Sequence, residues 1–150
     1  VDMIVDLPTS SVGIAVAKVG NEKKRVVINT GSATKALTNE ECTPYHVHYA
    51  YDTYALANGT AKAVVQSGGK NWFFLTADYA FGHALEKDAA DVVKANGGEV
   101  RGAVRHPLSA SDFSSFLLQA QSSKAQIIGL ANAGGDTINA IKAANEFGLT

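Results

Sequence analysis

The chain has 150 residues, a formal net charge of −1 at pH 7 and 46% hydrophobic residues. This length is enough for a domain with a sizeable core, and the near balance of charge argues against nucleic acid or a cationic partner. No apolar run approaches the roughly 20 residues needed to cross a bilayer. Because the sequence opens at Val1 just before a strand and closes after a helix, we expect a middle piece of a longer protein, with any targeting segment upstream.

The first third of the chain alternates apolar strands with a helical segment. Thr9 or Ser10 is a natural N-cap for the helix, and Gly20-Asn21 is a natural stop. The expected elements are strands at residues 3–5, 25–29 and 45–51, a helix at residues 10–19, and a short helical turn with a loop at residues 35–44.

The remainder of the chain repeats a helix–strand alternation. The strand expected at residues 71–75 is continuously apolar, which is typical of a parallel strand covered on both faces. The elements expected around it are a helix capped by Asp52 and ended by Gly68-Gly69, a helix ending at Asn96, a strand at residues 100–104, a short helix capped by Asp112, a strand at residues 127–130 and a helix capped near Asp136.

In each helix, residues at helical spacing predict the buried face. The expected buried residues are Val12, Ala15, Val16 and Val19 in the first helix, Leu56, Thr60, Ala63 and Val64 in the second, Leu85, Ala89, Val92 and Val93 in the third, Phe113, Phe116, Leu117 and Ala120 in the fourth, and Ile138, Ile141, Ala144 and Phe147 in the last.

Strands that alternate with helices predict an α/β fold with parallel sheets and right-handed crossovers. The apolar-strand pattern weakens at residues 48–52 before a new series begins, so this segment is the candidate domain boundary. Small-residue loops follow four of the strands. Ligands bind open α/β sheets at the carboxyl ends of the strands, so these loops predict a small-molecule site.

Two of these loops are rich in hydroxyl groups. Thr9, Ser10 and Ser11 precede a helix, where free backbone N–H groups and the helix dipole favour an anion such as a carboxylate. The loop Gly31-Ser32-Ala33-Thr34 is a second cradle of this kind. Simple N-capping is the commoner explanation for a single loop of this kind, whereas two such loops after neighbouring strands make an anion site an equally good explanation.

The other two loops differ in chemistry. Tyr79 and Phe81 place aromatic surface at the end of a strand. These rings would either line a site for an apolar or aromatic ligand, or Phe81 would belong to the core and Tyr79 would be a surface ring. Asn132 and Ala133 precede two glycines, which either allow a ligand to approach the backbone or form a plain turn with Asp136 as N-cap.

Catalytic and metal-binding patterns are weak. His46 and His48 share a face of their strand, but no third metal ligand is near them in the sequence. No nucleophile elbow, zinc-binding helix or phosphate-binding glycine loop is present in the sequence. We therefore expect neither catalysis, nor a metal, nor a cofactor. The single Cys42 is either a structural thiol or the partner of a cysteine outside the chain.

Five segments together resemble a known family. The sequence is similar to the leucine/isoleucine/valine-type periplasmic binding proteins, which are extracellular ligand-binding receptors of ABC importers. The resemblance covers the whole chain, and Ala77–Gly82 is its most specific part. The segments that carry it are Leu7–Ser11, Asn29–Thr38, Tyr51–Tyr54, Thr76–Gly82 and Ala143–Leu149.

The resemblance implies part of a type I periplasmic binding protein, a two-lobed Venus flytrap with Rossmann-like parallel sheet layers. Residues 1–49 would end the amino-terminal lobe, residues 50–150 would begin the carboxy-terminal lobe, and residues 48–52 would form a hinge crossing. The protein would be periplasmic, with a membrane permease as its partner. Open sheet edges in a piece of this fold predict self-association.

The resemblance also implies ligand contacts. Thr9 or Ser10 matches the hydroxyl that holds the ligand carboxylate, and the loop of Ser32, Ala33 and Thr34 matches the one that grips the amino-acid head group. Phe81 stands where amino-acid binders usually have tyrosine, and Asn132-Ala133 stands where they often have another. The full set of expected ligand-binding residues is Thr9, Ser10, Ser32, Ala33, Thr34, Tyr79, Phe81, Asn132 and Ala133.

The departure at Phe81 bears on the ligand. A buried ligand amine left without a partner costs about 1–3 kcal/mol, so we favour a carboxylate with an apolar or aromatic body, while branched-chain amino acids stay open. Two other functions stay open as well: a ligand sensor or regulator of the same fold, and half of a doubly wound enzyme. A lipobox or a fused signalling segment outside the chain would separate transport from sensing.

Overall fold

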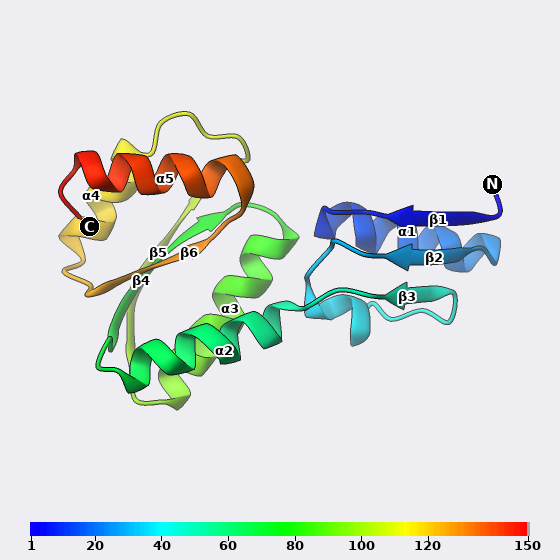
Figure 1. Cartoon of the computed structure of the whole chain (residues 1–150), viewed down its shortest axis with the longest axis horizontal. Coiled ribbons are helices and arrows are strands. Elements are labelled where there is room, and N and C mark those ends of the chain that lie inside the picture. The colour runs from blue at the N-terminus through cyan, green and yellow to red at the C-terminus, as the bar shows by residue number, and fades with distance from the viewer. Residues whose placement is uncertain (150) are drawn as a thin grey trace.

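The computed structural model describes residues 1–149, so Thr150, the last residue of the expected second domain, lies outside the described residues. The strands form two separate three-stranded sheets, and every strand pair in them is parallel (Figure 1). The expected α/β class and the alternation of strands and helices are confirmed. None of the described helices is both long and apolar enough to cross a membrane.

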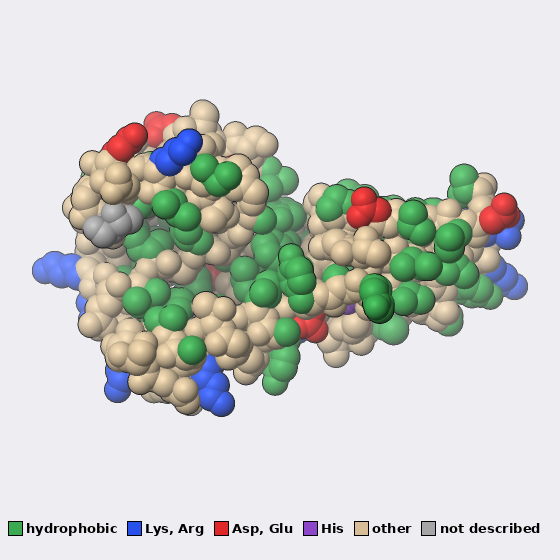
Figure 2. Space-filling view, viewed as in Figure 1, with side chains coloured by type: hydrophobic (Ala, Val, Ile, Leu, Met, Phe, Trp, Pro, Cys, Tyr) green, Lys and Arg blue, Asp and Glu red, His purple; other side chains and the backbone are tan. Residues whose placement is uncertain are grey.

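The first sheet has the order β1-β2-β3 and is covered by helix α1 on one face. We call this part the β1–β3 unit. Its opposite face is bare and apolar, as Figure 2 shows, because alternate strand residues such as Met3, Val5 and Val47 point away from α1. Its elements are β1 (Met3–Asp6), α1 (Ser10–Lys23), β2 (Val26–Asn29), the 3-10 helix η1 (Lys35–Thr38) and β3 (His46–His48).

The second sheet has the order β5-β4-β6 and carries helices on both faces. We call this part the β4–β6 unit. Central β4 is buried from Trp72 to Ala77, as its continuous apolar run predicts. Trp72 and Phe74 pack against α2 and α3, while Leu75 packs against α4 and α5. The elements are α2 (Thr53–Gln66), β4 (Asn71–Ala77), α3 (Ala80–Ala95), β5 (Glu99–His106), α4 (Ser114–Ser122), β6 (Ile127–Ala131) and α5 (Gly134–Glu146).

Three helices bury a different face from the one that the apolar spacing predicts. In α1 the expected Val12 and Val19 are about half exposed, and in α5 the expected Ile138 and Ile141 are also exposed. The expectation for these positions, and for Thr60 and Ala63 of α2, was wrong because small residues let the helices lie close to the sheet or to one another. The residues that are buried instead are Ser10, Gly13, Ala17 and Gly20 in α1, Thr53, Ala57, Ala61 and Val65 in α2, and Asp136 and Ala140 in α5. The expected Ala144 of α5 is buried as predicted.

The start of α2 is where the sequence predicts it, but the end of α1 is not. Asp52 caps α2, since its Oδ1 accepts a hydrogen bond from the Ala55 N–H at 2.8 Å. Gly20 does not end α1. A Cβ there would stand 2.4 Å from Val27 Cγ2, so the glycine allows close helix–sheet contact. The helix ends instead at Lys24, which adopts the left-handed conformation.

Candidate ligand-binding site

All four small-residue loops lie at the carboxyl ends of parallel strands, as expected. The arrows of β1, β2 and β3 in Figure 1 point toward the β4–β6 unit. At this junction the N-termini of α1 and α3 meet, because Ser11 Oγ accepts a hydrogen bond from the Ala80 N–H at 3.4 Å. The loop of Thr9 and Ser10 is thereby brought next to the loop of Tyr79 and Phe81, although about 70 residues separate them.

The loop after β2 is fixed by buried polar side chains. Asn29 Oδ1 accepts hydrogen bonds from the Gly31 N–H at 3.2 Å and the Ser32 N–H at 2.9 Å. Ser32 Oγ donates to the Leu7 carbonyl at 2.6 Å, which ties this loop to the loop after β1. His48 Nε2 donates to the Ser32 carbonyl at 2.6 Å from the neighbouring strand. The loop therefore presents a preset backbone.

The predicted hydroxyl residues differ in how they are used. Ser10 Oγ accepts a hydrogen bond from the Thr34 N–H at 3.2 Å, so the two predicted hydroxyl loops are in direct contact. Ser32 and Thr34 are buried, as is Ala33 between them, and the Thr34 hydroxyl accepts a hydrogen bond from the Ala36 N–H. Thr9 stands at the N-cap position of α1 without making a side-chain capping bond. Among these residues, Thr9 has the hydroxyl best placed to bind an anion.

The aromatic loop of the β4–β6 unit is seated by a glycine. A Cβ at Gly82 would lie 2.1 Å from the Ala77 carbonyl oxygen and 3.0 Å from that of Ala131, so only glycine lets α3 start this close to β4 and β6. This seating holds Tyr79 and Phe81 side by side, with ring centroids 5.9 Å apart. Both rings are half-buried, which leaves aromatic surface accessible at the junction.

Asn132 is held by a polar chain behind the loop after β6. Its Nδ2 donates to His106 Nε2 at 3.1 Å, and its Oδ1 accepts from the Thr137 hydroxyl at 2.8 Å. His106 is fully buried, and its Nδ1 donates to the Pro107 carbonyl at 2.8 Å. Because the Asn132 amide is already paired, its ligand contact would come from the backbone of Asn132 and exposed Ala133.

Asp136 is not the N-cap of α5. Ala133 occupies that position, and Asp136 is buried in the first turn, where its carboxylate accepts a hydrogen bond from the Ser109 N–H at 3.2 Å. Burial, and then the negative charges of Asp136 and Tyr51, raise the pKa of Tyr79 above its ordinary value. The loops after β4 and β6 and the segment before α2 therefore lie within electrostatic reach of one another.

The histidine pair of β3 shares one face, as expected, with ring centroids 6.1 Å apart. Residues 1–149 contain no group of three or more side chains arranged to hold a metal ion. A largely apolar groove lies between α2, α3 and β6, where it is lined by residues such as Leu56, Trp72 and Ile127. The groove runs along β6, which is an edge strand of the described sheet. Apart from Thr60 its lining residues are apolar, so it offers little polar chemistry to a ligand.

Two contacts between the units have no signal in the sequence pattern. One is the Ser11–Ala80 hydrogen bond, and the other is a cluster of Lys35, Thr53 and Asp88. Ser11 and Ala80 each lie in one of the four loops, but nothing in the sequence pattern indicates that these two loops touch. Lys35 and Asp88 are separated by 53 residues, and neither forms a local motif that indicates the other.

Comparison with known proteins decides the family. A family model described as "Periplasmic binding protein" matches residues 1–150. The chain belongs to the periplasmic binding protein family. A crystal structure of such a periplasmic binding protein from Burkholderia mallei is 70% identical to the chain, with a TM-score of 0.97 over 99% of the chain and 40% of that protein.

Two other similar proteins differ in the ligands that their names carry. A solute-binding protein of an ABC transporter from R. palustris, solved in complex with 4-hydroxybenzoate, is 30% identical, with a TM-score of 0.90 over 99% of the chain and 40% of that protein. Leu/Ile/Val-binding protein homolog 6 of Brucella melitensis is 29% identical over 125 residues, which are 83% of the chain and 31% of that protein. The chain thus spans less than half the length of these relatives.

Proposed function

We propose that the chain is part of a solute-binding protein of an ABC importer and captures a small carboxylate ligand between two lobes. Residues 1–49 would end the amino-terminal lobe, residues 50–150 would begin the carboxy-terminal lobe, and the crossing near residues 48–52 would serve as a hinge. Ligand binding would close the lobes about this crossing. Family membership and the two separate parallel sheets support this division.

The observation that carries the proposal is the meeting of α1 and α3 at their N-termini. The Ser11–Ala80 hydrogen bond places a hydroxyl loop of one unit opposite an aromatic loop of the other. Both helix starts offer free N–H groups and a partial positive charge to an anion. A ligand with a carboxylate and an apolar body matches this pair of surfaces.

Each predicted residue has a role in this account. Thr9 binds the carboxylate through its hydroxyl, and Ser10 supports it by fixing the Thr34 N–H. The loop of Ser32, Ala33 and Thr34 contributes the Ala33 N–H, because its side chains are buried and its other backbone groups are already hydrogen-bonded. The ligand body would lie against the ring pair, and the loop after β6 would close the far side. These last contacts come from Tyr79, Phe81, Asn132 and Ala133.

Two ligand classes fit, and we favour aromatic acids over branched-chain amino acids. Phe81 offers no hydroxyl to an α-amine, and one relative was solved with 4-hydroxybenzoate. The name of the curated relative, a Leu/Ile/Val-binding protein homologue, supports the other class. The ligand would be captured in the periplasm, without catalysis, and delivered to the membrane permease of the importer.

A thermal-shift assay on the complete protein tests the proposal. A ligand at free concentration L that binds only the folded state stabilises it by RT ln(1 + L/Kd), so at equal concentration the tighter ligand raises the melting temperature more. We expect benzoate or 4-hydroxybenzoate to raise it more than leucine or phenylalanine at equal concentration. A shift with leucine alone would replace the aromatic-acid assignment, and no shift with any of the four would contradict the proposal.

A further inference from the structure

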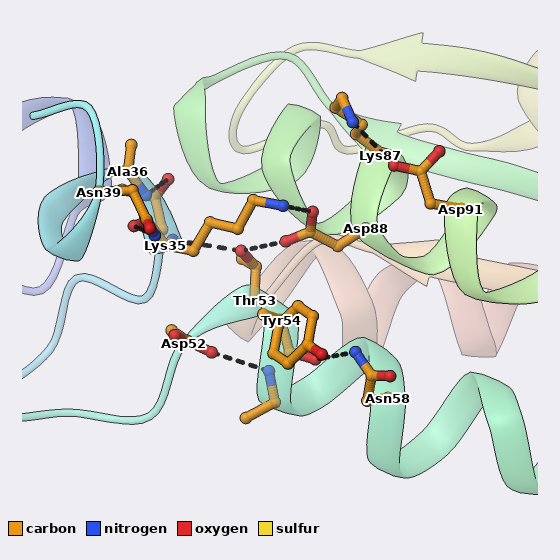
Figure 3. Close-up of polar contacts among 12 residues, drawn as sticks. Lys35, Ala36, Asn39, Asp52, Thr53, Tyr54, Asn58, Lys87, Asp88 and Asp91 are labelled. Atoms are coloured by element: carbon orange, nitrogen blue, oxygen red, sulfur yellow. Dashed lines mark hydrogen bonds and ion pairs between the residues drawn. The ribbon is translucent and has the colours of Figure 1, made fainter.

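A polar cluster of Lys35, Thr53 and Asp88 links the two units at their junction. Figure 3 shows Lys35 and Thr53 pointing at the carboxylate of Asp88 from separate elements. Lys35 Nζ forms an ion pair with Asp88 Oδ1, and Thr53 Oγ1 donates to Asp88 Oδ2 at 2.7 Å. The cluster joins the start of η1, the start of α2 and the middle of α3.

Backbone hydrogen bonds extend the cluster into the loop after β2. The Thr53 N–H donates to the Ala33 carbonyl at 2.8 Å, and the Lys35 N–H donates to the Thr53 hydroxyl at 3.3 Å. Thr53 is fully buried, and its backbone N–H and hydroxyl together hydrogen-bond to the loop after β2 and to the Asp88 carboxylate. Asp88 thus holds, through Thr53 and Lys35, the loop to which we assign ligand contacts.

The same carboxylate also fixes the aromatic side of the proposed site. Asp88 lies two turns along α3 from Phe81, about 10 Å at a rise of 1.5 Å per residue. Since α3 is a rigid helix whose start is seated by Gly82, holding its middle sets the distance between Phe81 and the loop of Ser32 to Thr34. Asp88 is therefore coupled to both halves of the site.

The burial of this ion pair is uneven. The Asp88 side chain is 2% exposed, while that of Lys35 is 32% exposed. A buried carboxylate without its partner is strongly unfavourable, whereas a partly exposed ammonium recovers hydration when its partner is removed. By contrast, Lys87 and Asp91 on the same helix form an exposed ion pair, 2.7 Å apart, that faces away from the junction.

We propose that Asp88 is a positioning residue for the ligand site: it touches no ligand, but it sets the loop of Ser32 to Thr34 against α3 through Lys35 and Thr53. This inference rests on the proposed function, because that proposal is what assigns the loop of Ser32 to Thr34 and Phe81 to the ligand site. The tie itself is a property of the ligand-free protein, so it is open to a test that needs no ligand.

Hydrogen exchange of the complete, ligand-free protein is that test. In Asp88→Asn we expect the amides of Lys35 and Thr53 to exchange about tenfold faster or more, because the loop loses its anchor, while amides of β4 keep their rates. Asp91→Asn is the matched control and should change neither set. Unchanged exchange at Lys35 and Thr53 in Asp88→Asn would overturn the inference. Thr53→Val removes the same link without touching the charge and replaces Asp88→Asn if that variant does not fold.

Substitution of Lys35 allows a rescue experiment on the same ion pair. Lys35→Met leaves the buried carboxylate unpaired and should accelerate exchange more than Asp88→Asn does. The double variant Lys35→Met/Asp88→Asn removes the stranded charge, so it should exchange more slowly than Lys35→Met alone. Strictly additive effects of the two substitutions would contradict a direct coupling between these side chains.

Affinity separates the inference from the proposed function. For whichever of 4-hydroxybenzoate, benzoate, leucine and phenylalanine the wild-type protein binds, Asp88→Asn should raise the Kd about tenfold, while Asp91→Asn leaves it unchanged. An equal Kd in wild type and Asp88→Asn overturns the inference and leaves the proposed function standing. If the wild type binds none of the four, the proposed function fails, and the exchange rates alone decide whether Asp88 positions the loop.

Discussion

Single residues at the junction show how closely the backbone must pack to build the site. At Gly82 the space for a Cβ is taken by the Ala77 and Ala131 carbonyl oxygens. At Gly13 it is taken by Ser32 Oγ and Asn29 Nδ2, at 2.4 and 2.6 Å. Each of these glycines lets a helix lie against one of the loops that we assign to the ligand.

Substitution of Gly82 by alanine should therefore destabilise the complete protein. We expect a loss of about 1–3 kcal/mol in the free energy of unfolding, measured in urea, because α3 must move away from β4. Gly59, inside α2, has no atom within 4 Å of an added Cβ, so Gly59→Ala is the control and should stabilise by about 0.5–1 kcal/mol. Equal effects of the two substitutions would contradict the close seating of α3.

His46 disfavours its charged form in the folded protein. Burial, and then the charge of His48, lower its pKa below the ordinary 6.5, and its Nε2 is buried without a partner. The unfolded chain therefore takes up the proton first as pH falls, so stability present above pH 6.5 is lost as pH drops below it.

Replacement of His46 isolates this contribution. In His46→Gln the fall in the free energy of unfolding between pH 7 and pH 5 should be smaller than in the wild type, as measured by urea titrations at each pH. An identical pH dependence in both proteins would show that the folded state does not disfavour the charged imidazole.

At the scale of elements, small residues decide which helix face is buried. The sequence predicts that α1 buries Val12 and Val19, because large aliphatic side chains recur at helical spacing. The structure buries Gly13, Ala17 and Gly20 instead, which brings the helix axis close to β2. Val12 and Val19 therefore face away from the sheet and are exposed in the described chain.

Enlarging the small face of α1 tests this packing. Ala17 is 1% exposed, so Ala17→Leu should overpack the helix against the sheet and destabilise by about 1–3 kcal/mol. Val19 is 50% exposed, and Val19→Ala should change the unfolding free energy by no more than about 0.5 kcal/mol. The reverse order of the two effects in urea unfolding would restore the valine face as the buried one.

The sequence predicts the elements better than it predicts their contacts. Apolar runs and glycines place every strand and helix and the four loops, because these signals are local. The predicted faces of α3 and α4 are confirmed. Those of α1, α2 and α5 are wrong in part, because apolar spacing weighs side-chain size, while close helix–sheet packing selects small residues. The cluster of Lys35, Thr53 and Asp88 could not be predicted, since the contact depends on how α3 lies across the junction.

At the scale of the whole molecule, the described chain has two parallel sheets with open edges and a bare apolar face on the β1–β3 unit. Parallel sheets are normally covered on both faces, and free edges pair readily with another chain. The 150-residue chain alone should therefore sediment as concentration-dependent oligomers.

A charge on the edge strand should reduce this association. Val5→Lys places a lysine on the bare face of edge strand β1, whereas Val12→Lys alters an equally exposed valine on α1. Sedimentation velocity should show less association for Val5→Lys only. A chain that stays monomeric at all concentrations would contradict the expectation from its open edges.

We propose that a carboxylate ligand binds between a hydroxyl loop and an aromatic pair at the junction of the two units. Isothermal titration calorimetry of the complete protein with 4-hydroxybenzoate, benzoate, leucine and phenylalanine tests it most directly. We predict binding of an aromatic acid that is weakened about tenfold or more by Thr9→Ala and by Phe81→Ala, and left unchanged by Thr60→Ala on the exposed side of α2. Binding that is unaffected by Thr9→Ala and Phe81→Ala would contradict the account.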